Sequence, residues 1–177
     1  MKIYFNDEHI LLRDMVREFA VNEIRPNAQN VDTGVFPSEN IKKMAELGLM
    51  GIPWDEEYGG NGMDSIALVI AIEELGKECA STAATMMAHT SLGTAPIAIF
   101  GTDEQKEKYL PGLCSGKMLG AFGLTEPNAG SDAGNTQTRA TLKGDGYIVN
   151  GQKAFCTNAG YAGTIIFTAI IDNNSGE

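Results

Sequence analysis

Gly-Ala-Phe-Gly-Leu-Thr-Glu-Pro-Asn-Ala-Gly-Ser-Asp-Ala-Gly, residues 120 to 134, separates two kinds of sequence pattern in this chain. An apolar run from Met118 to Leu124 predicts a strand, which passes at Thr125-Glu126-Pro127 into a loop rich in Gly, Asn, Ser and Asp. Glycines allow close approach of a ligand, and free N–H groups and short hydroxyl side chains bind phosphates or ring heteroatoms. The loop fits a cofactor-binding loop or an ordinary turn, and its local composition alone favours the turn.

On the amino-terminal side of this stretch the pattern is helical. Apolar residues recur at helical spacing over residues 10–24, behind Asn6 as a good N-cap, and Pro26 is expected to end the helix. A second, shorter helix is expected over residues 39–47, with Gly48 as its carboxy-terminal stop.

Two further helices are apolar on most of their faces. Asp64 is expected to cap the first, which runs to about Cys79, and Ser81 is expected to cap the second. Helices of this kind form the centre of a bundle or line a ligand cavity. A short helix opening at Gly101-Thr102-Asp103 should end at Pro111-Gly112.

The second apolar helix carries both large and small side chains. Met86 and Met87 are expected to pack in the core. Thr85, Ala88 and Leu92 are three and four residues apart, so they should share one helix face. Small residues on that face leave room for a ligand, or they allow two helices to approach closely.

After residue 115 the periodicity changes to that of strands. Asp145-Gly146 and Asn150-Gly151 are strong signals for tight turns. The sequence therefore predicts an α+β fold: an all-α bundle over residues 1–115, followed over residues 116–177 by an incomplete antiparallel β-domain with an unfinished edge at the polar carboxy-terminal end. The expected strands are Met118–Leu124, Gln137–Leu142, Tyr147–Val149, Ala154–Thr157 and Thr164–Ile171.

Composition argues against several classes of function. The net charge of −10 over 177 residues argues against nucleic acid or an anionic membrane surface as a partner. Cys79, Cys114 and Cys156 are widely spaced and lack a C-x-x-C pair, so neither a zinc site nor a disulfide framework is expected. Because no apolar run reaches membrane-spanning length and no leader-like segment opens the sequence, we expect a cytoplasmic protein.

An ordered set of short motifs runs through the chain: Glu57-Tyr58-Gly59-Gly60-Asn61-Gly62, Ala71-Ile72-Glu73-Glu74-Leu75, Ser91-Leu92-Gly93, Phe100-Gly101-Thr102 through Gln105-Lys106 to Tyr109-Leu110, Leu124-Thr125-Glu126-Pro127 with Gly130-Ser131-Asp132, and Asn150-Gly151-Gln152-Lys153 with Thr157-Asn158. Together they resemble the amino-terminal part of the acyl-CoA dehydrogenases, flavoenzymes that oxidise acyl-CoA thioesters to 2-enoyl-CoA. The resemblance leans towards the short-chain, butyryl-CoA members. It implies that the chain stops before the second, carboxy-terminal helical domain of that family.

The resemblance also implies a cofactor, FAD, and two sets of site residues. Many members carry a tryptophan and an isoleucine where this chain has Phe155 and Cys156. Ser131 is implied to contact the CoA part of the substrate as well as the cofactor. The residues implied to bind FAD are Phe122, Gly123, Leu124, Thr125, Gly130, Ser131, Phe155, Cys156 and Thr157, and those implied to face the acyl chain are Ala84, Thr85, Ala88 and Leu92.

The resemblance assigns no catalytic residue and no metal ligand to this chain. The family's base is a glutamate of the later helical domain, which takes the α-proton while the β-hydrogen leaves as a hydride to the flavin. Glu126 is interpreted instead as a carboxylate that accepts N–H groups of its own loop, and His89 as a packed or hydrogen-bonded histidine.

The resemblance further implies acyl-CoA as substrate, an electron-transfer flavoprotein as electron acceptor, and a homotetramer for the full-length protein. Apolar surface should be exposed where the later helices would pack. Two alternatives stay open, because a fold does not fix a function. One is a related flavin protein with other chemistry, such as oxygen-dependent hydroxylation, and the other is a catalytically silent binding module.

Overall fold

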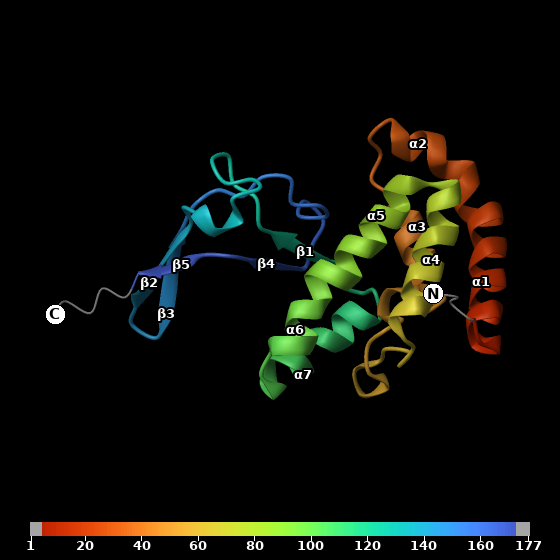
Figure 1. The fold of residues 1–177 in the computed structure, drawn as a ribbon, viewed down its shortest axis with the longest axis horizontal. Helices are drawn as coiled ribbons and strands as arrows, with labels where there is room; N and C mark the ends of the chain where they lie inside the picture. The colour runs from red at the N-terminus through yellow and green to blue at the C-terminus, as the bar shows by residue number, and fades with distance from the viewer. Residues whose placement is uncertain (1–4, 173–177) are drawn as a thin grey trace.

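The computed structural model describes residues 5–172, and Figure 1 shows its helices gathered at one end and its strands at the other. This order agrees with the predicted α+β fold. The helical part consists of α1 (Asp7–Phe19), the π-helical η1 (Ala20–Ile24), the 3-10 turn η2 (Arg25–Asn27), α2 (Ala28–Asp32), α3 (Ser38–Glu46), the 3-10 turns η3 (Leu49–Gly51) and η4 (Glu56–Tyr58), α4 (Ser65–Glu78), α5 (Ala80–Met87), the π-helical η5 (Ala88–Thr94), α6 (Ala95–Phe100) and α7 (Asp103–Cys114).

The predicted helix starts at Asn6 and Asp64 are confirmed. The Asn6 side chain accepts from His9 N at 2.8 Å, and the Asp64 carboxylate accepts from Ala67 N at 2.9 Å. The predicted cap at Ser81 is wrong, because α5 begins at residue 80 directly after a single extended residue.

Two prolines do not act as the predicted helix stops. The chain continues through Pro26 because η1 and η2 change the helix type there, and a proline is tolerated in the first turn of a new segment. Helix α7 likewise passes Pro111 and Gly112. It ends when Gly116 adopts a left-handed φ of 69° and donates its N–H to Leu113 O at 3.0 Å.

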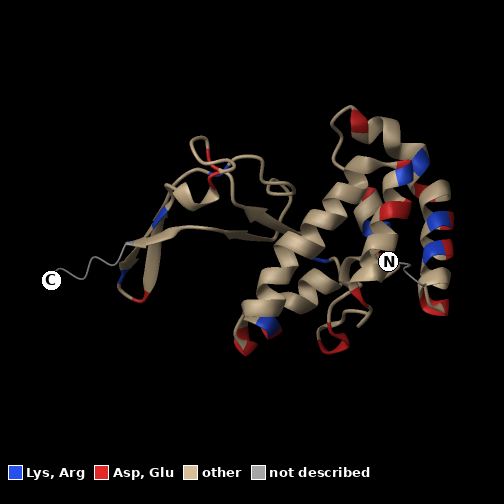
Figure 2. Cartoon of the chain, in the orientation of Figure 1, with Lys and Arg blue, Asp and Glu red and all other residues tan. Residues whose placement is uncertain are grey.

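The core of the bundle lies along α4, which packs between α1 and α5. Figure 2 shows charged residues of both signs on α1, and Arg17 there forms a bidentate pair with the buried Glu74 of α4, at 3.0 and 3.1 Å. Met86 is fully buried as predicted, whereas Met87 is 44% exposed. Neighbouring helical residues point about 100° apart, so only one of the two can face the core.

The strands are β1 (Gly120–Gly123), β2 (Arg139–Lys143), β3 (Gly146–Asn150), β4 (Thr164–Phe167) and β5 (Ile170–Asp172). Among the strands of residues 5–172, the predicted antiparallel arrangement holds only for the β2–β3 hairpin, while β1–β4 and β2–β5 are parallel. Parallel pairing is possible because long connections return the chain in its original direction. The predicted strand over residues 164–171 is divided in two, and each half joins a different sheet. The predicted polar turn at the carboxy-terminal end lies outside the described residues.

The bundle meets the β part where η5 packs on β1. His89 of η5 is fully buried: its Nδ1 accepts from Gly120 N at 2.9 Å, and its Nε2 lies 3.2 Å from Leu113 O. Because Nδ1 accepts, the neutral ring carries its proton on Nε2. Burial lowers the pKa of His89 to about 4. The prediction of a packed, hydrogen-bonded histidine is confirmed.

Acid is therefore expected to destabilise the protein through His89. The stabilisation by the neutral ring is complete above the ordinary pKa of 6.5 and is lost as the pH falls to about 4. Between these two pH values, the protonation of His89 in the unfolded chain should lower the free energy of unfolding by about 3 kcal/mol. Urea unfolding at a series of pH values should show that this acid-dependent loss in the free energy of unfolding is absent from the His89→Gln variant. Identical pH profiles for the two proteins would contradict the assignment.

Candidate functional site

Strand β1 forms the centre of the candidate site. On one edge it pairs in parallel with β4, with Gly120 opposite Thr164. On the other edge the carbonyls of Gly120 and Phe122 accept from Asn158 Nδ2 at 3.2 Å and from Cys156 Sγ at 3.1 Å. Alternate carbonyls of a strand point to the same edge, so both bonds hold one segment alongside β1.

That segment, residues 154–158, runs antiparallel to β1 without being a strand. Ala154 N donates to Thr125 O at 2.8 Å. Residues 154, 156 and 158 thus bond to residues 125, 122 and 120 in turn, which is the order of an antiparallel pair. Phe155 and Asn158 have left-handed φ angles of 54° and 73°, which interrupt a regular ladder. The predicted strand at Ala154–Thr157 is therefore wrong, although its position beside β1 is strand-like.

Phe155 is the most unusual residue of this segment. Its side chain is 94% exposed, and its backbone is held in a conformation that non-glycine residues rarely adopt. Backbone outliers of this kind typically cost about 1–3 kcal/mol and cluster at ligand sites. An aromatic ring held in the open by a constrained backbone has the properties expected of one wall of a ligand site.

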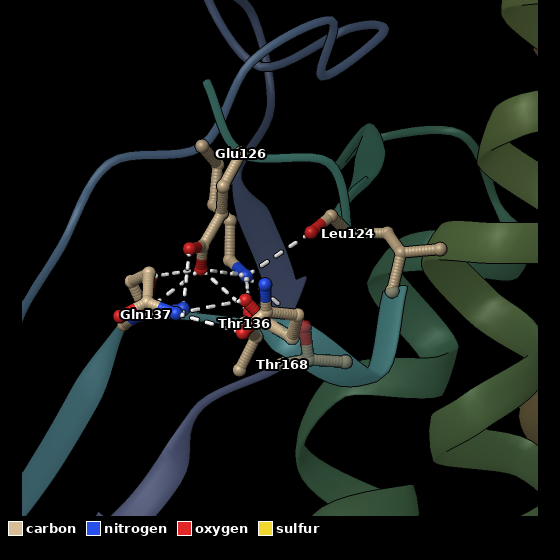
Figure 3. Close-up of polar contacts among 8 residues, drawn as sticks. Leu124, Glu126, Thr136, Gln137 and Thr168 are labelled. Atoms are coloured by element: carbon tan, nitrogen blue, oxygen red, sulfur yellow. Dashed lines mark hydrogen bonds and ion pairs between the residues drawn. The ribbon is translucent and has the colours of Figure 1, made fainter. Parts of the chain in front are cut away.

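A buried polar network fixes the loop that follows β1 (Figure 3). The carboxylate of Glu126 accepts from Gln137 N at 2.5 Å, Thr138 N at 3.1 Å and the Thr136 hydroxyl at 2.6 Å. Lys153 Nζ lies 2.7 Å from the same carboxylate. The ammonium of Lys153, followed by the threonine hydroxyls, lowers the pKa of Glu126 far below its usual range.

Glu126 is thus a carboxylate whose oxygens are occupied by loop donors, as the sequence interpretation held. A group that stays ionised and saturated with hydrogen bonds is a poor proton acceptor. Its partner Lys153 also contacts Leu124 O at 3.1 Å and the Thr168 hydroxyl at 3.0 Å. Lys153 belongs to the Asn150-Gly151-Gln152-Lys153 motif, for which the sequence predicted no such role. A buried carboxylate needs a cation or several hydrogen-bond donors, but no local pattern in the sequence marked Lys153 as that cation.

The implied acyl-facing residues do not all share one face. Thr85 and Ala88 are buried, whereas Leu92 is 45% exposed. Leu92 lies in η5, where the wider π turn rotates later side chains away from the α-helical spacing. An open hollow of about 400 Å³ brings Ala84 and Thr85 of α5 beside Thr157 and Asn158.

The remaining implied cofactor residues lie along β1 and its loop. Gly123 is buried, and a Cβ there would lie 3.0 Å from Lys153 Cγ, so glycine lets the lysine stem pass. Thr125 is partly buried, while Leu124, Gly130 and Ser131 are exposed, the last two in the loop before the 3-10 turn η6 (Ala133–Asn135). The structure brings Phe122 to Thr125 next to residues 154–158, and no hydrogen bond among the described residues ties Gly130 or Ser131 to that segment.

Comparison with known proteins defines the class of protein. Residues 6–117 match the family model "Acyl-CoA dehydrogenase, N-terminal domain", and residues 121–177 match "Acyl-CoA dehydrogenase, middle domain". The chain therefore belongs to the acyl-CoA dehydrogenase family. Within residues 5–172, no helix is both long and apolar enough to cross a membrane. The same residues contain no cluster of acidic, cysteine and histidine side chains suited to a metal ion.

Individual relatives sharpen this assignment. The chain is 54% identical over 98% of its length to a probable acyl-CoA dehydrogenase, YngJ, of Bacillus subtilis, and 52% identical over 96% to a short-chain specific acyl-CoA dehydrogenase of Clostridium acetobutylicum. It spans 46% and 45% of these two relatives.

Two solved structures show the same fold. Butyryl-CoA dehydrogenase from Megasphaera elsdenii matches with a TM-score of 0.91 at 40% identity, over 99% of this chain and 47% of that one. An acyl-CoA dehydrogenase from Bacillus anthracis, solved as a complex with FAD, matches with a TM-score of 0.90 at 38% identity, over 95% of this chain and 29% of that one.

Proposed function

We propose that this chain is the amino-terminal part of an FAD-dependent acyl-CoA dehydrogenase that converts a short- or medium-chain acyl-CoA to the 2-enoyl-CoA. The full-length protein that contains it is called the whole protein below. The observation that supports the proposal most directly is that two segments, Phe122 to Thr125 and Phe155 to Thr157, are held side by side by hydrogen bonds. Because the family includes a member solved as an FAD complex, we assign these segments to one wall of a cofactor site.

The chemistry of these residues suits a flavin. The open ring of Phe155 offers an apolar face to an aromatic ring system. The hydroxyls of Thr125 and Thr157 offer hydrogen bonds to ring heteroatoms, and the exposed loop at Gly130 and Ser131 extends this surface. The chemistry that FAD supplies when bound is the acceptance of a hydride from the substrate.

The acyl chain is proposed to lie against the α5–η5 side of the site. Ala84 and Thr85 border the hollow beside Thr157, and the small side chain of Ala88 follows one turn later. We retain Leu92 as a contact at the exposed rim, and Ser131 as a contact to the CoA part. Short or medium acyl groups fit a space bordered by such small residues.

The base that removes the α-proton is proposed to lie outside these 177 residues. The locked carboxylate of Glu126 supports this placement. We also propose a division into domains at residues 115 and 116, supported by the change from helix to strand between Cys114 and Gly120.

The exposed Phe100 and Ile99 support further packing partners for this chain. The proposal includes an electron-transfer flavoprotein as electron acceptor and a homotetrameric assembly, both expected from the family resemblance. It also includes a cytoplasmic location, as expected from the sequence pattern.

Replacing Phe155 by alanine in the whole protein tests the proposed cofactor wall. Because the ring is exposed, the stability of the FAD-free protein should not change, whereas the affinity for FAD should fall roughly tenfold through lost stacking. Tyr147→Ala is the control, since this aromatic residue of β3 is 54% exposed and lies away from the proposed wall. Wild-type FAD affinity in the Phe155→Ala variant, measured by flavin titration, would refute the proposed wall.

A further inference from the structure

We infer that Asn158 is a positioning residue, which fixes the segment from Phe155 to Thr157 between β1 and helix α5. The inference rests on the proposed function, because it gives that segment a defined place relative to the helix proposed to face the acyl chain. Asn158 was noted in the sequence only as part of a motif.

The side-chain amide of Asn158 makes both connections at once. Its Nδ2 donates to Gly120 O on β1 at 3.2 Å and to Thr85 O on α5 at 3.0 Å. Because both partners are carbonyls, which only accept, the orientation of the amide is fixed. Its Oδ1 is buried without a partner among the described residues. Burying an acceptor without a hydrogen bond costs free energy, so the two hydrogen bonds donated by Nδ2 must offset that cost.

The other attachments of the segment reach β1 and its loop but not the helix. Ala154 N bonds to Thr125 O, and the Cys156 thiol, a weak donor, bonds to Phe122 O. Among the described residues of this segment, Asn158 alone forms a hydrogen bond to α5. It therefore sets the separation between Thr157 and the helix at Thr85, which both border the same hollow.

The backbone of Asn158 suits this role. Its φ of 73° lies in the left-handed region, which asparagine, aspartate and glycine tolerate better than other residues. Two substitutions can therefore remove the amide while keeping the backbone conformation. Asn158→Asp is nearly isosteric but directs an oxygen at two carbonyls. Asn158→Gly removes the side chain without adding repulsion.

Both variants should be made in the whole protein, with Asn22→Asp at an exposed site on the bundle as the control for added charge. We expect Asn158→Asp to weaken FAD binding roughly tenfold, as two hydrogen bonds are lost, to shift the visible absorption bands of bound FAD, and to lower kcat more than it raises KM. Asn158→Gly should produce the same changes to a smaller extent. The control should match the wild type.

A wild-type spectrum and kcat in folded Asn158→Asp would overturn the inference while leaving the proposed function intact. If Asn158→Asp does not fold, Asn158→Gly decides in the same way: a wild-type flavin spectrum and kcat in that variant overturn the inference. Failure of the unmodified whole protein to bind FAD would instead overturn the proposed function itself.

Discussion

Replacing Lys153 by methionine is expected to lower the melting temperature of the protein by about 10 °C. The substitution leaves the Glu126 carboxylate, which is only 4% exposed, without its cation. It also removes the donor that joins Leu124 O to the Thr168 hydroxyl, so the loop after β1 loses its attachment to the end of β4. Thermal unfolding followed by circular dichroism measures the effect.

The double variant Lys153→Met with Glu126→Gln tests the cause of this loss. Removing the buried charge should restore part of the melting temperature, because much of the loss comes from the unpaired carboxylate. Lys143→Met, at an exposed lysine of the β2–β3 hairpin, is the matched control and should melt like the wild type. A double variant that melts below Lys153→Met would show that the ion pair is not the source of the stability.

Replacing Gly93 by alanine is expected to separate the bundle from the β part. A Cβ at this position would lie 2.5 Å from Gly120 C and 2.7 Å from Ala121 N, and backbone atoms cannot rotate away from it. Helix η5 and strand β1 must move apart, which also strains the bond between His89 and Gly120. The expected loss in the free energy of unfolding is about 3 kcal/mol.

Gly160→Ala is the matched control for this substitution. A Cβ at Gly160 would have no atom within 4 Å, so urea unfolding should give a value close to that of the wild type. If Gly93→Ala is as stable as Gly160→Ala, η5 and β1 do not approach each other as closely as described.

The local signals in the sequence predicted local structure well. Asn6 and Asp64 cap their helices, the change from helices to strands occurs where the periodicity changes, and the β2–β3 hairpin lies at a predicted turn. Strand direction was not predictable in this way. The parallel pairing of β1 with β4 depends on where two long connections return, and local periodicity carries no information about that.

The candidate site was predicted in its position but not in its internal geometry. The π turn of η5 rotates Leu92 outward, and the left-handed backbone of Phe155 replaces an expected strand. The pairing of Glu126 with Lys153 spans 27 residues, so neither residue reveals the other by spacing. These features follow from tertiary packing, which overrides local preference.

The measurement that tests the proposed function most directly is an anaerobic titration of the whole protein with butyryl-CoA and a medium-chain acyl-CoA. The purified protein should show a flavin absorption spectrum that bleaches on addition of at least one of these thioesters, without any added reductant. A flavin spectrum that none of the thioesters bleaches, or a whole protein that binds no flavin, would contradict the account.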